Sequence, residues 1–389
     1  MKFFDAIIVG VGLAGLQCAK LLSQQGASIL LVDRKTDLTK GVHTTGIFVR
    51  KTFEDFDFPA GVLGRPIRNV TLYPPSLEGI SLQSSKDEFR VGDMGRLYRA
   101  ILDDCLENGA EFAKGTRYLG AETKSDEIVV SLEYKGIGFK VGAKVLVGAD
   151  GANSHVAHDL GLDENKEWIV GYEEVYHSHT QNNEPKLHCF LDAKLAPGYL
   201  AWIADDGEEM HIGVGGYADK FEPKTALNKF RDNIASQFVD VKAAQLSETR
   251  GGRIPVGGVL RHIANEHGLL IGDAAGAVSP LTAGGLDPCL RLSAMAAKVV
   301  TERLKKDDPK LMLCYSGKLF RTRFTSRLWM RKVISALSNQ ATLEAGCAFL
   351  RTGIGKKFAE HVFFGRGSFP DVEINVENKR GRTFAEEIR

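Results

Sequence analysis

Three glycines near the start of the chain have the spacing of a phosphate-binding turn. Gly10, Gly12 and Gly15 form a GxGxxG sequence between an apolar run that ends at Val9 and a segment with helical apolar spacing. Glycines permit the tight turn from strand to helix, and they let a pyrophosphate approach the N–H groups at the helix start. Asp33 ends the next apolar run, where a carboxylate can accept both hydroxyls of a ribose. The pattern predicts a dinucleotide-binding turn and leaves open whether the dinucleotide is NAD or FAD.

Two further glycine motifs follow apolar runs later in the chain. Residues 147–154 are Val-Gly-Ala-Asp-Gly-Ala-Asn-Ser, and residues 271–276 are Ile-Gly-Asp-Ala-Ala-Gly, followed by Pro280 and by Thr-Ala-Gly-Gly-Leu at 282–286. The order GxGxxG, GADG and GDAAG resembles the FAD-dependent oxidoreductases with the p-hydroxybenzoate hydroxylase fold, and within them the geranylgeranyl reductase family. The resemblance covers roughly residues 1–305. It implies that the dinucleotide is FAD.

The resemblance implies a cofactor role for each matching residue. The glycine turn would hold the pyrophosphate, Asp33 the adenosine ribose and Asp273 the ribityl chain, since a carboxylate at a strand end suits polyol hydroxyls. A helix opening at Gly285 would direct its N–H groups at N1 and O2 of reduced flavin. The cofactor-binding candidates are Gly10, Gly12, Gly15, Asp33, Arg34, Arg96, Asp150, Gly151, Gly272, Asp273, Pro280, Gly284, Gly285 and Leu286.

Two kinds of reaction occur on this fold, and the motifs favour reduction. Related monooxygenases have GDAAH, whereas Gly276 replaces that histidine here, and residues 280–285 resemble the reductase version. The expected reaction is hydride transfer from flavin N5 to a carbon–carbon double bond of an isoprenoid or other apolar substrate. The alternatives are monooxygenation through a C4a-hydroperoxide and a flavin-binding protein without turnover. No second dinucleotide fingerprint appears, so the electron donor, NAD(P)H or reduced ferredoxin, is expected to bind transiently.

Three residues are candidates for contact with the substrate. Tyr199 and Trp202 lie in a stretch similar to the reductases' YxWxFPK motif, although Leu200 replaces its tyrosine; sheet core is the alternative interpretation. His43 stands where related prenyl reductases have a cysteine near the flavin, and an imidazole could supply a proton near neutral pH. A hydrogen bond that holds its own loop is the alternative role for His43. A further departure is Ala157, which stands where the family has an arginine after the GADG motif.

The elements that must position these residues are interleaved in sequence. Strand–turn–helix–strand over residues 5–33 begins a Rossmann-type βαβ unit, and polar alternation over 169–216 predicts an antiparallel sheet. We predict an α/β fold with an FAD-binding domain (1–50, 90–163 and 255–305) interleaved with an antiparallel-sheet substrate domain (51–89 and 164–254). A helical C-terminal region and tail would occupy 306–389.

Composition and charge limit the possible partners. The 50 basic and 49 acidic residues balance, which argues against a nucleic-acid partner. No uncharged run is long enough to span a membrane, and we expect a cytoplasmic protein with reduced cysteines and no metal site. Residues 316–366 are basic with apolar residues at helical spacing. They are expected either to rest on a membrane surface that carries a lipid-like substrate, or to pack apolar side chains inward with the cations in solvent. The oligomeric state is left open.

Overall fold

The first sheet carries the predicted glycine turns. The computed structural model describes residues 1–124, 127–177, 184–241, 243–336 and 339–365. This sheet has the order β8-β2-β1-β11-β10-β9, and β17 pairs with the last residues of β11. The pairs among β8, β2, β1, β11 and β17 are parallel. The pairs formed by β11, β10 and β9 are antiparallel. Its strands are β1 (Phe3–Val9), β2 (Ile29–Asp33), β8 (Glu111–Lys114), β9 (Thr116–Lys124), β10 (Glu127–Tyr134), β11 (Ile137–Gly148) and β17 (Gly268–Leu270).

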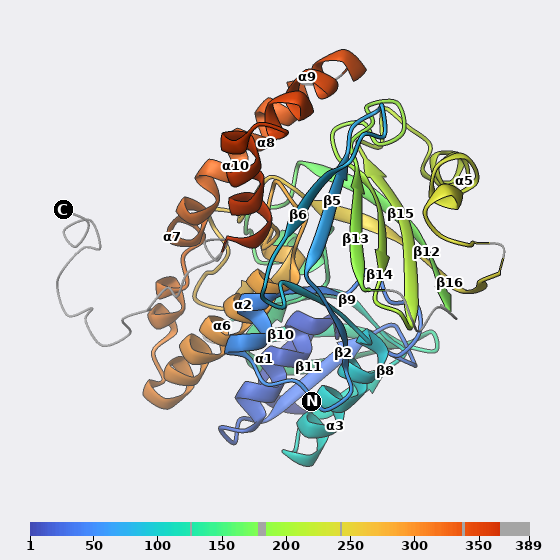
Figure 1. Ribbon diagram of the computed structural model, residues 1–389. Coiled ribbons are helices and arrows are strands. Elements are labelled where there is room, and N and C mark those ends of the chain that lie inside the picture. Colours follow the sequence, from blue (N-terminus) through green and yellow to red (C-terminus); the bar gives the residue numbers. More distant parts are fainter. Residues whose placement is uncertain (125–126, 178–183, 242, 337–338, 366–389) are drawn as a thin grey trace.

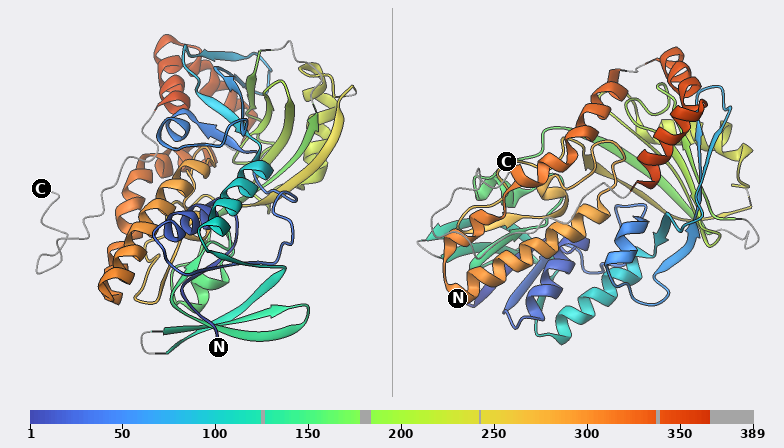
Figure 2. Two further views of the ribbon diagram at one scale, coloured as in Figure 1. Left: turned by 90° about the horizontal axis from the view of Figure 1, so that it is seen from below. Right: turned by 60° about the vertical axis from the view of Figure 1, so that its left-hand side comes forward.

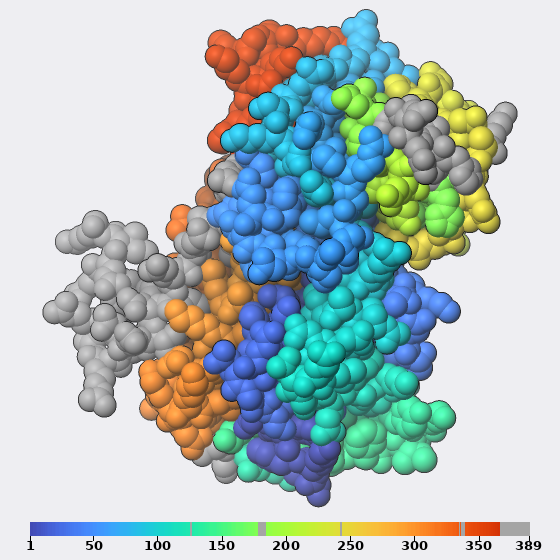
Figure 3. Space-filling model, turned by 60° about the horizontal axis from the view of Figure 1, so that its bottom comes forward, coloured from blue at the N-terminus to red at the C-terminus, as the bar shows by residue number. Residues whose placement is uncertain are grey.

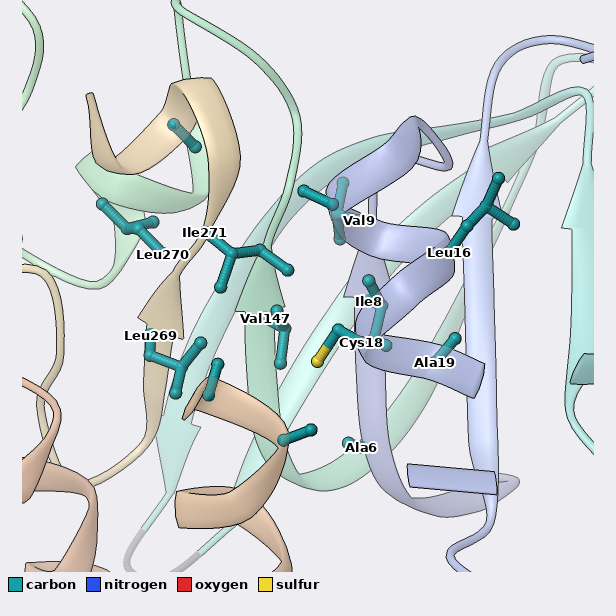
Figure 4. Packing of buried hydrophobic residues seen from close by; sticks show 14 of the residues in the cluster. Ala6, Ile8, Val9, Leu16, Cys18, Ala19, Val147, Leu269, Leu270 and Ile271 are labelled. Carbon is teal, nitrogen blue, oxygen red and sulfur yellow. The ribbon is translucent and has the colours of Figure 1, made fainter. Parts of the chain in front are cut away.

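Helices cover one face of the parallel strands. Helix α1 (Leu13–Ser23) packs against α3 (Met94–Glu107) and α6 (Leu286–Lys306). Cys18 of α1 points toward Ile8 of β1 and Val147 of β11 in the main hydrophobic core, and Leu16 belongs to the same core on another side of α1 (Figure 4). Strands buried on both faces explain why their sequences are continuous apolar runs. The ends of these strands therefore meet the starts of α1 and α6 at one edge of the sheet.

The second sheet is almost entirely antiparallel. Its order is β16-β12-β15-β14-β13-β5-β6, with only β13 and β5 parallel among its described pairs. Helix α5 (Pro223–Asn233) covers one face, where its Leu227 and Phe230 pack against Ile212 and Val214. The strands are β5 (Asn69–Tyr73), β6 (Ile80–Gln83), β12 (Trp168–His177), β13 (Lys186–Phe190), β14 (Ala201–Asp205), β15 (Glu209–Gly216) and β16 (Gln245–Pro255).

Short elements connect the two sheets. A small sheet with the order β3-β7-β4 is formed by β3 (Ile47–Val49), β7 (Phe89–Gly92) and β4 (Leu63–Ile67). It leads on one side into α2 (Arg50–Asp55) and on the other into α3. The remaining short helices are α4 (His155–Asp159) and the 3₁₀ turns η1 (Ala235–Gln237) and η2 (Gly272–Ala275).

The C-terminal helices run along one side of both sheets. They are η3 (Pro309–Cys314), α7 (Gly317–Arg321), η4 (Thr322–Phe324), α8 (Thr325–Ala336), α9 (Gln340–Leu350) and α10 (Gly353–Phe364). They extend from the first sheet to the far end of the second sheet (Figures 1 and 2). In Figure 3 the orange part marks the end at the first sheet, and the red part marks the end at the second sheet. Cys347 and Ala359 join the core formed with β5, β6 and β13. The predicted fold class is thereby confirmed; the predicted tail from 366 onward lies outside the described residues.

Candidate active site

The first strand-to-helix turn leaves free space at the start of α1. Gly10 has φ +97°, and a Cβ there would lie 2.2 Å from the carbonyl oxygen of Ala149, so this position requires glycine. Gly15 lies so close that its Cβ would be 2.0 Å from the oxygen of Gly10. Gly12, the N-cap of α1, has ordinary extended backbone angles, and nothing lies within 4 Å of its Cβ position. The first turn of α1 is thus accessible to an anion.

Asp33 ties this turn to the end of β2. Its Oδ2 accepts a 2.8 Å hydrogen bond from the N–H of Val11, and its Oδ1 accepts one of 2.8 Å from Lys35. Each oxygen keeps a lone pair for another donor, as a ribose contact needs. The neighbouring Arg34 is exposed.

Asp273 follows β17, and its partly exposed carboxylate is free to accept hydrogen bonds. Within the part of the chain that the structure describes, no side chain or backbone N–H donates to it, and burial raises its pKa to about 6. A Cβ at Gly285 would lie 3.6 Å from its Oδ1, so the carboxylate lies beside the first residues of α6. Gly285 is the N-cap of α6 and has no capping side chain. An unpartnered acceptor next to an uncapped helix start suits a polyol hydroxyl and a nearby anion.

Two other predicted cofactor residues have structural partners. Asp150 accepts hydrogen bonds from the Ser154 hydroxyl (2.6 Å) and from the N–H groups of His155 (2.7 Å) and Val156 (3.2 Å), which fixes the GADG loop. Gly151, the next residue, has φ +84°. Arg96 is exposed at the start of α3 and pairs with Asp93 at 3.2 Å, beside a surface pocket of about 470 Å³.

The loop between η2 and α6 is attached to the second sheet. Tyr199 donates a 2.7 Å hydrogen bond to the oxygen of Thr282, and its ring meets that of Trp202 edge to face with centroids 6.4 Å apart. The indole of Trp202 lies over β15, where a Cβ at Gly213 would be 2.2 Å from the ring. Both predicted substrate residues therefore lie where the second sheet meets the loop that contains Pro280, Gly284 and Gly285.

The loop after β2 reaches the same sheet. Nδ1 of His43 lies 3.1 Å from the carbonyl oxygen of Gly251. Partial burial and the Lys35 cation lower the pKa of His43, so the ring is neutral near pH 7. Because the carbonyl only accepts, Nδ1 holds the ring proton and Nε2 is left as an acceptor. Thr45 of this loop donates a 2.6 Å hydrogen bond to Oε2 of Glu173 on β12.

Two arginines of α8 also hold the flavin-side loop, and the sequence interpretation missed them. Arg327 donates to the Ser279 hydroxyl at 2.9 Å, and Arg331, only 5% exposed, donates to the oxygen of Pro280 at 3.0 Å. Trp329, on the same helix, is 65% exposed. The expectation that this helix turns its apolar residues inward and leaves its cations in solvent is wrong for these positions. The i, i+4 spacing of the two arginines was the only available signal that they share a face.

The described ranges contain neither a membrane-spanning helix nor a metal site. None of their helices combines the length and apolar character needed to cross a bilayer. No group of His, Cys, Asp and Glu side chains in these ranges has the geometry of a metal site.

Comparison with known proteins gives consistent matches. Residues 4–328 match the model of the family described as the FAD binding domain. Digeranylgeranylglycerophospholipid reductase 2 of Methanosphaera stadtmanae is 27% identical over 322 residues, which cover 78% of this chain and 79% of that protein. A geranylgeranyl bacteriochlorophyll reductase-like structure from Thermoplasma acidophilum has a TM-score of 0.81 at 19% identity, covering 94% and 98% of the two chains. The p-nitrophenol 4-monooxygenase of Pseudomonas putida has a TM-score of 0.71 at 13% identity, covering 96% and 100%.

These matches confirm the resemblance stated from the glycine motifs. The features of the site fit FAD. The free space at Gly12 fits its pyrophosphate, the carboxylate of Asp273 fits its ribityl chain, and the uncapped start of α6 fits the pyrimidine edge of its flavin. The chain belongs to the FAD binding domain family and is an FAD-dependent oxidoreductase that is similar to digeranylgeranylglycerophospholipid reductases.

Proposed function

We propose that this protein reduces carbon–carbon double bonds of an isoprenoid lipid. The observation that carries the proposal is the similarity, over 78% of the chain, to a reductase whose name gives a digeranylgeranyl phospholipid as its substrate. The residue Gly276, which stands where related monooxygenases have a histidine, supports the proposal. A Cβ at Gly276 would lie 2.7 Å from the carbonyl oxygen of Gly258. A side chain at this position therefore requires a rearranged loop.

The proposed roles of the residues follow from their surroundings. When bound, FAD supplies a hydride at N5. The first turn of α1 binds the pyrophosphate at Gly12, Asp33 orients the adenosine ribose, and Asp273 accepts hydrogen bonds from the ribityl hydroxyls. The start of α6 stabilises negative charge at N1 and O2. Tyr199 and Trp202 border the substrate, and Arg96 faces the cofactor diphosphate.

The source of electrons is a separate proposal. We expect NAD(P)H or reduced ferredoxin to bind transiently, with Asp150 and Gly151 near the pyridine nucleotide. Ala157, where the family has an arginine, is fully buried beneath the GADG loop. This favours a donor that needs no cation at that position.

The reduction is tested by product analysis. FAD-loaded protein is reduced chemically without oxygen and mixed with a digeranylgeranyl phospholipid, and the lipid is examined by mass spectrometry. We expect the lipid to gain pairs of hydrogen atoms, and boiled protein with free FAD to give none. An unchanged lipid, or an aromatic compound that gains oxygen when air is admitted, would contradict the proposal and favour the monooxygenase.

Exposed apolar side chains on α10 suggest how a lipid is reached. Ile354 is 78% exposed and Phe358, one helical turn later, is also exposed, next to the exposed Lys357. Apolar residues flanked by cations are typical of a helix that rests on an anionic lipid surface. We propose a cytoplasmic protein that contacts the membrane peripherally through this part of 316–366.

Vesicle binding tests the membrane contact. Replacing both Ile354 and Phe358 with serine should reduce co-sedimentation with phosphatidylglycerol vesicles at least about fivefold, since each loses about 1–2 kcal/mol of apolar transfer energy. Ile137, 72% exposed in the hairpin between β10 and β11, provides the matched control, because Ile137→Ser should have no effect. Equal binding of the double variant and the wild type would contradict the contact.

A further inference from the structure

A buried ionic cluster lies on the face of the second sheet opposite α5. Glu173 on β12, His211 on β15 and Arg250 on β16 are 3%, 0% and 9% exposed. Oε1 of Glu173 lies 3.6 Å from Nδ1 of His211 and 3.7 Å from Nη1 of Arg250. Nε2 of His211 lies 3.5 Å from Oε2 of Glu209, which is partly exposed. The cluster thus connects the sheet interior to solvent through Glu209.

The cluster is poorly explained as a stabilising device. Burying charges costs several kcal/mol per ion unless hydrogen bonds satisfy them, and apolar replacements are often as stable. Yet Oε1 of Glu173 and both ring nitrogens of His211 are buried without a hydrogen bond among the described residues. The next residue, Glu174, points to the α5 face and accepts hydrogen bonds from Arg231 (2.9 Å) and Tyr176 (2.5 Å). Glu174 therefore shows the satisfied arrangement that Glu173 lacks.

The other oxygen of Glu173 faces the candidate active site. Oε2 accepts the 2.6 Å hydrogen bond from Thr45 and a 3.3 Å hydrogen bond from the indole of Trp202. Trp202 contacts Tyr199, which is bonded to the flavin-side loop at Thr282. Thr45 is only partly buried, whereas its partner Glu173 is 3% exposed.

From this geometry we propose that Glu209, His211, Glu173 and Thr45 form a proton relay that leads from solvent to the substrate. The relay deepens the proposed reduction and rests on it. When the double bond is reduced, one carbon would receive a hydride, which carries two electrons from reduced FAD. The other carbon would receive the hydroxyl proton of Thr45, and the FAD would be left oxidised. Thr45 regains a proton from Glu173, Glu173 from protonated His211, and His211 from solvent through Glu209. Thr45 is the group that contacts the substrate, and the others supply and position the proton.

The charges around His211 keep it protonated. Burial alone would lower its pKa, but the carboxylates of Glu173 and Glu209 outweigh burial and raise the pKa to about 9. The ionisable groups that face His211 are Glu173 from β12, Glu209 from β15, Asp205 from β14, Glu248 and Arg250 from β16, and His177 beyond Glu209. His43, by contrast, is neutral near pH 7 with an acceptor nitrogen free. The structure therefore favours His211 over His43 as the proton source.

The relay is tested in the half-reaction in which a prenyl lipid reoxidises the reduced flavin. Thr45→Val should slow reoxidation at least about 10-fold, because general-acid assistance contributes about 10²–10⁴-fold. It should leave flavin reduction by dithionite unchanged, and Thr45→Ser should restore the rate. The wild-type rate should fall as pH rises through about 9, as His211 loses its proton. Glu173→Gln should also slow reoxidation, because an amide cannot pass the proton on, and it should move the remaining decline to lower pH. The matched control Glu174→Gln should leave both the rate and the decline unchanged.

A second readout needs no cofactor. In the apoprotein, imidazole NMR should show one histidine that stays charged up to about pH 9, in the wild type and in Glu174→Gln but not in Glu173→Gln. The relay is overturned if Thr45→Val keeps the wild-type rate and pH profile, or if no histidine titrates near pH 9. If Glu173→Gln does not fold, Thr45→Val and Thr45→Ser decide. A wild type that reduces no lipid overturns the proposed function itself, whereas an active wild type with equally active Thr45→Val overturns the relay alone.

Discussion

Replacing Gly12 with valine is expected to abolish FAD binding while the apoprotein keeps its fold. Nothing lies within 4 Å of the Cβ position at Gly12, and its φ of −82° and ψ of −172° suit a branched residue. The free energy of unfolding of the apoprotein should therefore change by less than about 1 kcal/mol. A valine would instead occupy the space through which the pyrophosphate approaches the first turn of α1, so FAD affinity should fall at least about 100-fold.

Affinity and stability must be measured on the same preparations. Quenching of flavin fluorescence gives the FAD dissociation constant, and urea unfolding of the apoprotein gives its stability. Gly353→Val is the matched control, because Gly353 also stands at a helix start with nothing within 4 Å, at the beginning of α10. Binding of FAD by Gly12→Val within about threefold of wild type would show that the pyrophosphate lies elsewhere.

The apoprotein should lose stability as the pH rises from about 6.5 to about 9. The pKa of His211 is about 9 in the folded protein, above its ordinary value near 6.5. The folded state therefore holds a proton that the unfolded state has released in this interval, so the free energy of unfolding falls with pH. The stabilisation is fully present below about pH 6.5 and is lost by about pH 9, and its size is on the order of 3 kcal/mol.

Urea unfolding at several pH values measures this slope. His43 and His188 have lowered pKa values, so their effects fall below pH 6.5. The buried cysteines have raised pKa values and add to the loss as the pH approaches 9 in every variant, so the difference between wild type and Glu173→Gln isolates His211. Glu173→Gln should flatten the slope, and Glu174→Gln should keep it. A wild-type stability that is constant between pH 6.5 and 9 would mean that His211 is not held as a cation.

Local pattern was enough to predict the elements that carry the glycine motifs. Capping is equally local in α3, where Asp93 accepts from the N–H of Arg96 at the helix start and Gly109 follows the helix end. Continuous apolar runs predicted β1 and β2 because these strands are buried on both faces. Burial periodicity and helix capping depend on local sequence, so they could be predicted without a structure.

Contacts between distant segments could not be predicted in this way. Strand alternation places Glu173 and Glu174 on opposite faces of β12, but nothing local says which face meets the loop with Thr45, 128 residues earlier. The same applies to Tyr199 and Thr282, which lie 83 residues apart. In α8 the exposed Trp329 misled the interpretation, because a basic helix with apolar residues is ordinarily assumed to bury the apolar ones.

The fold is shared by reductases and monooxygenases, so the reaction depends on the loops around the flavin. In this chain the loop from η2 to α6 is held from two sides, by Tyr199 of the second sheet and by Arg327 and Arg331 of α8. Because the same loop contains Pro280 and Gly285, it connects the second sheet and the C-terminal helices to residues that we propose to bind the cofactor.

The most direct test of the account follows the flavin spectrum after rapid mixing. FAD-loaded protein, reduced without oxygen, is mixed with a digeranylgeranyl phospholipid in one experiment and with oxygenated buffer in another. A reductase should be reoxidised quickly by the lipid, and only slowly by oxygen alone, without a transient absorbance of oxygenated flavin. Accumulation of oxygenated flavin that an aromatic or lipid substrate causes to decay faster, with no anaerobic reoxidation by the lipid, would contradict the reductase assignment.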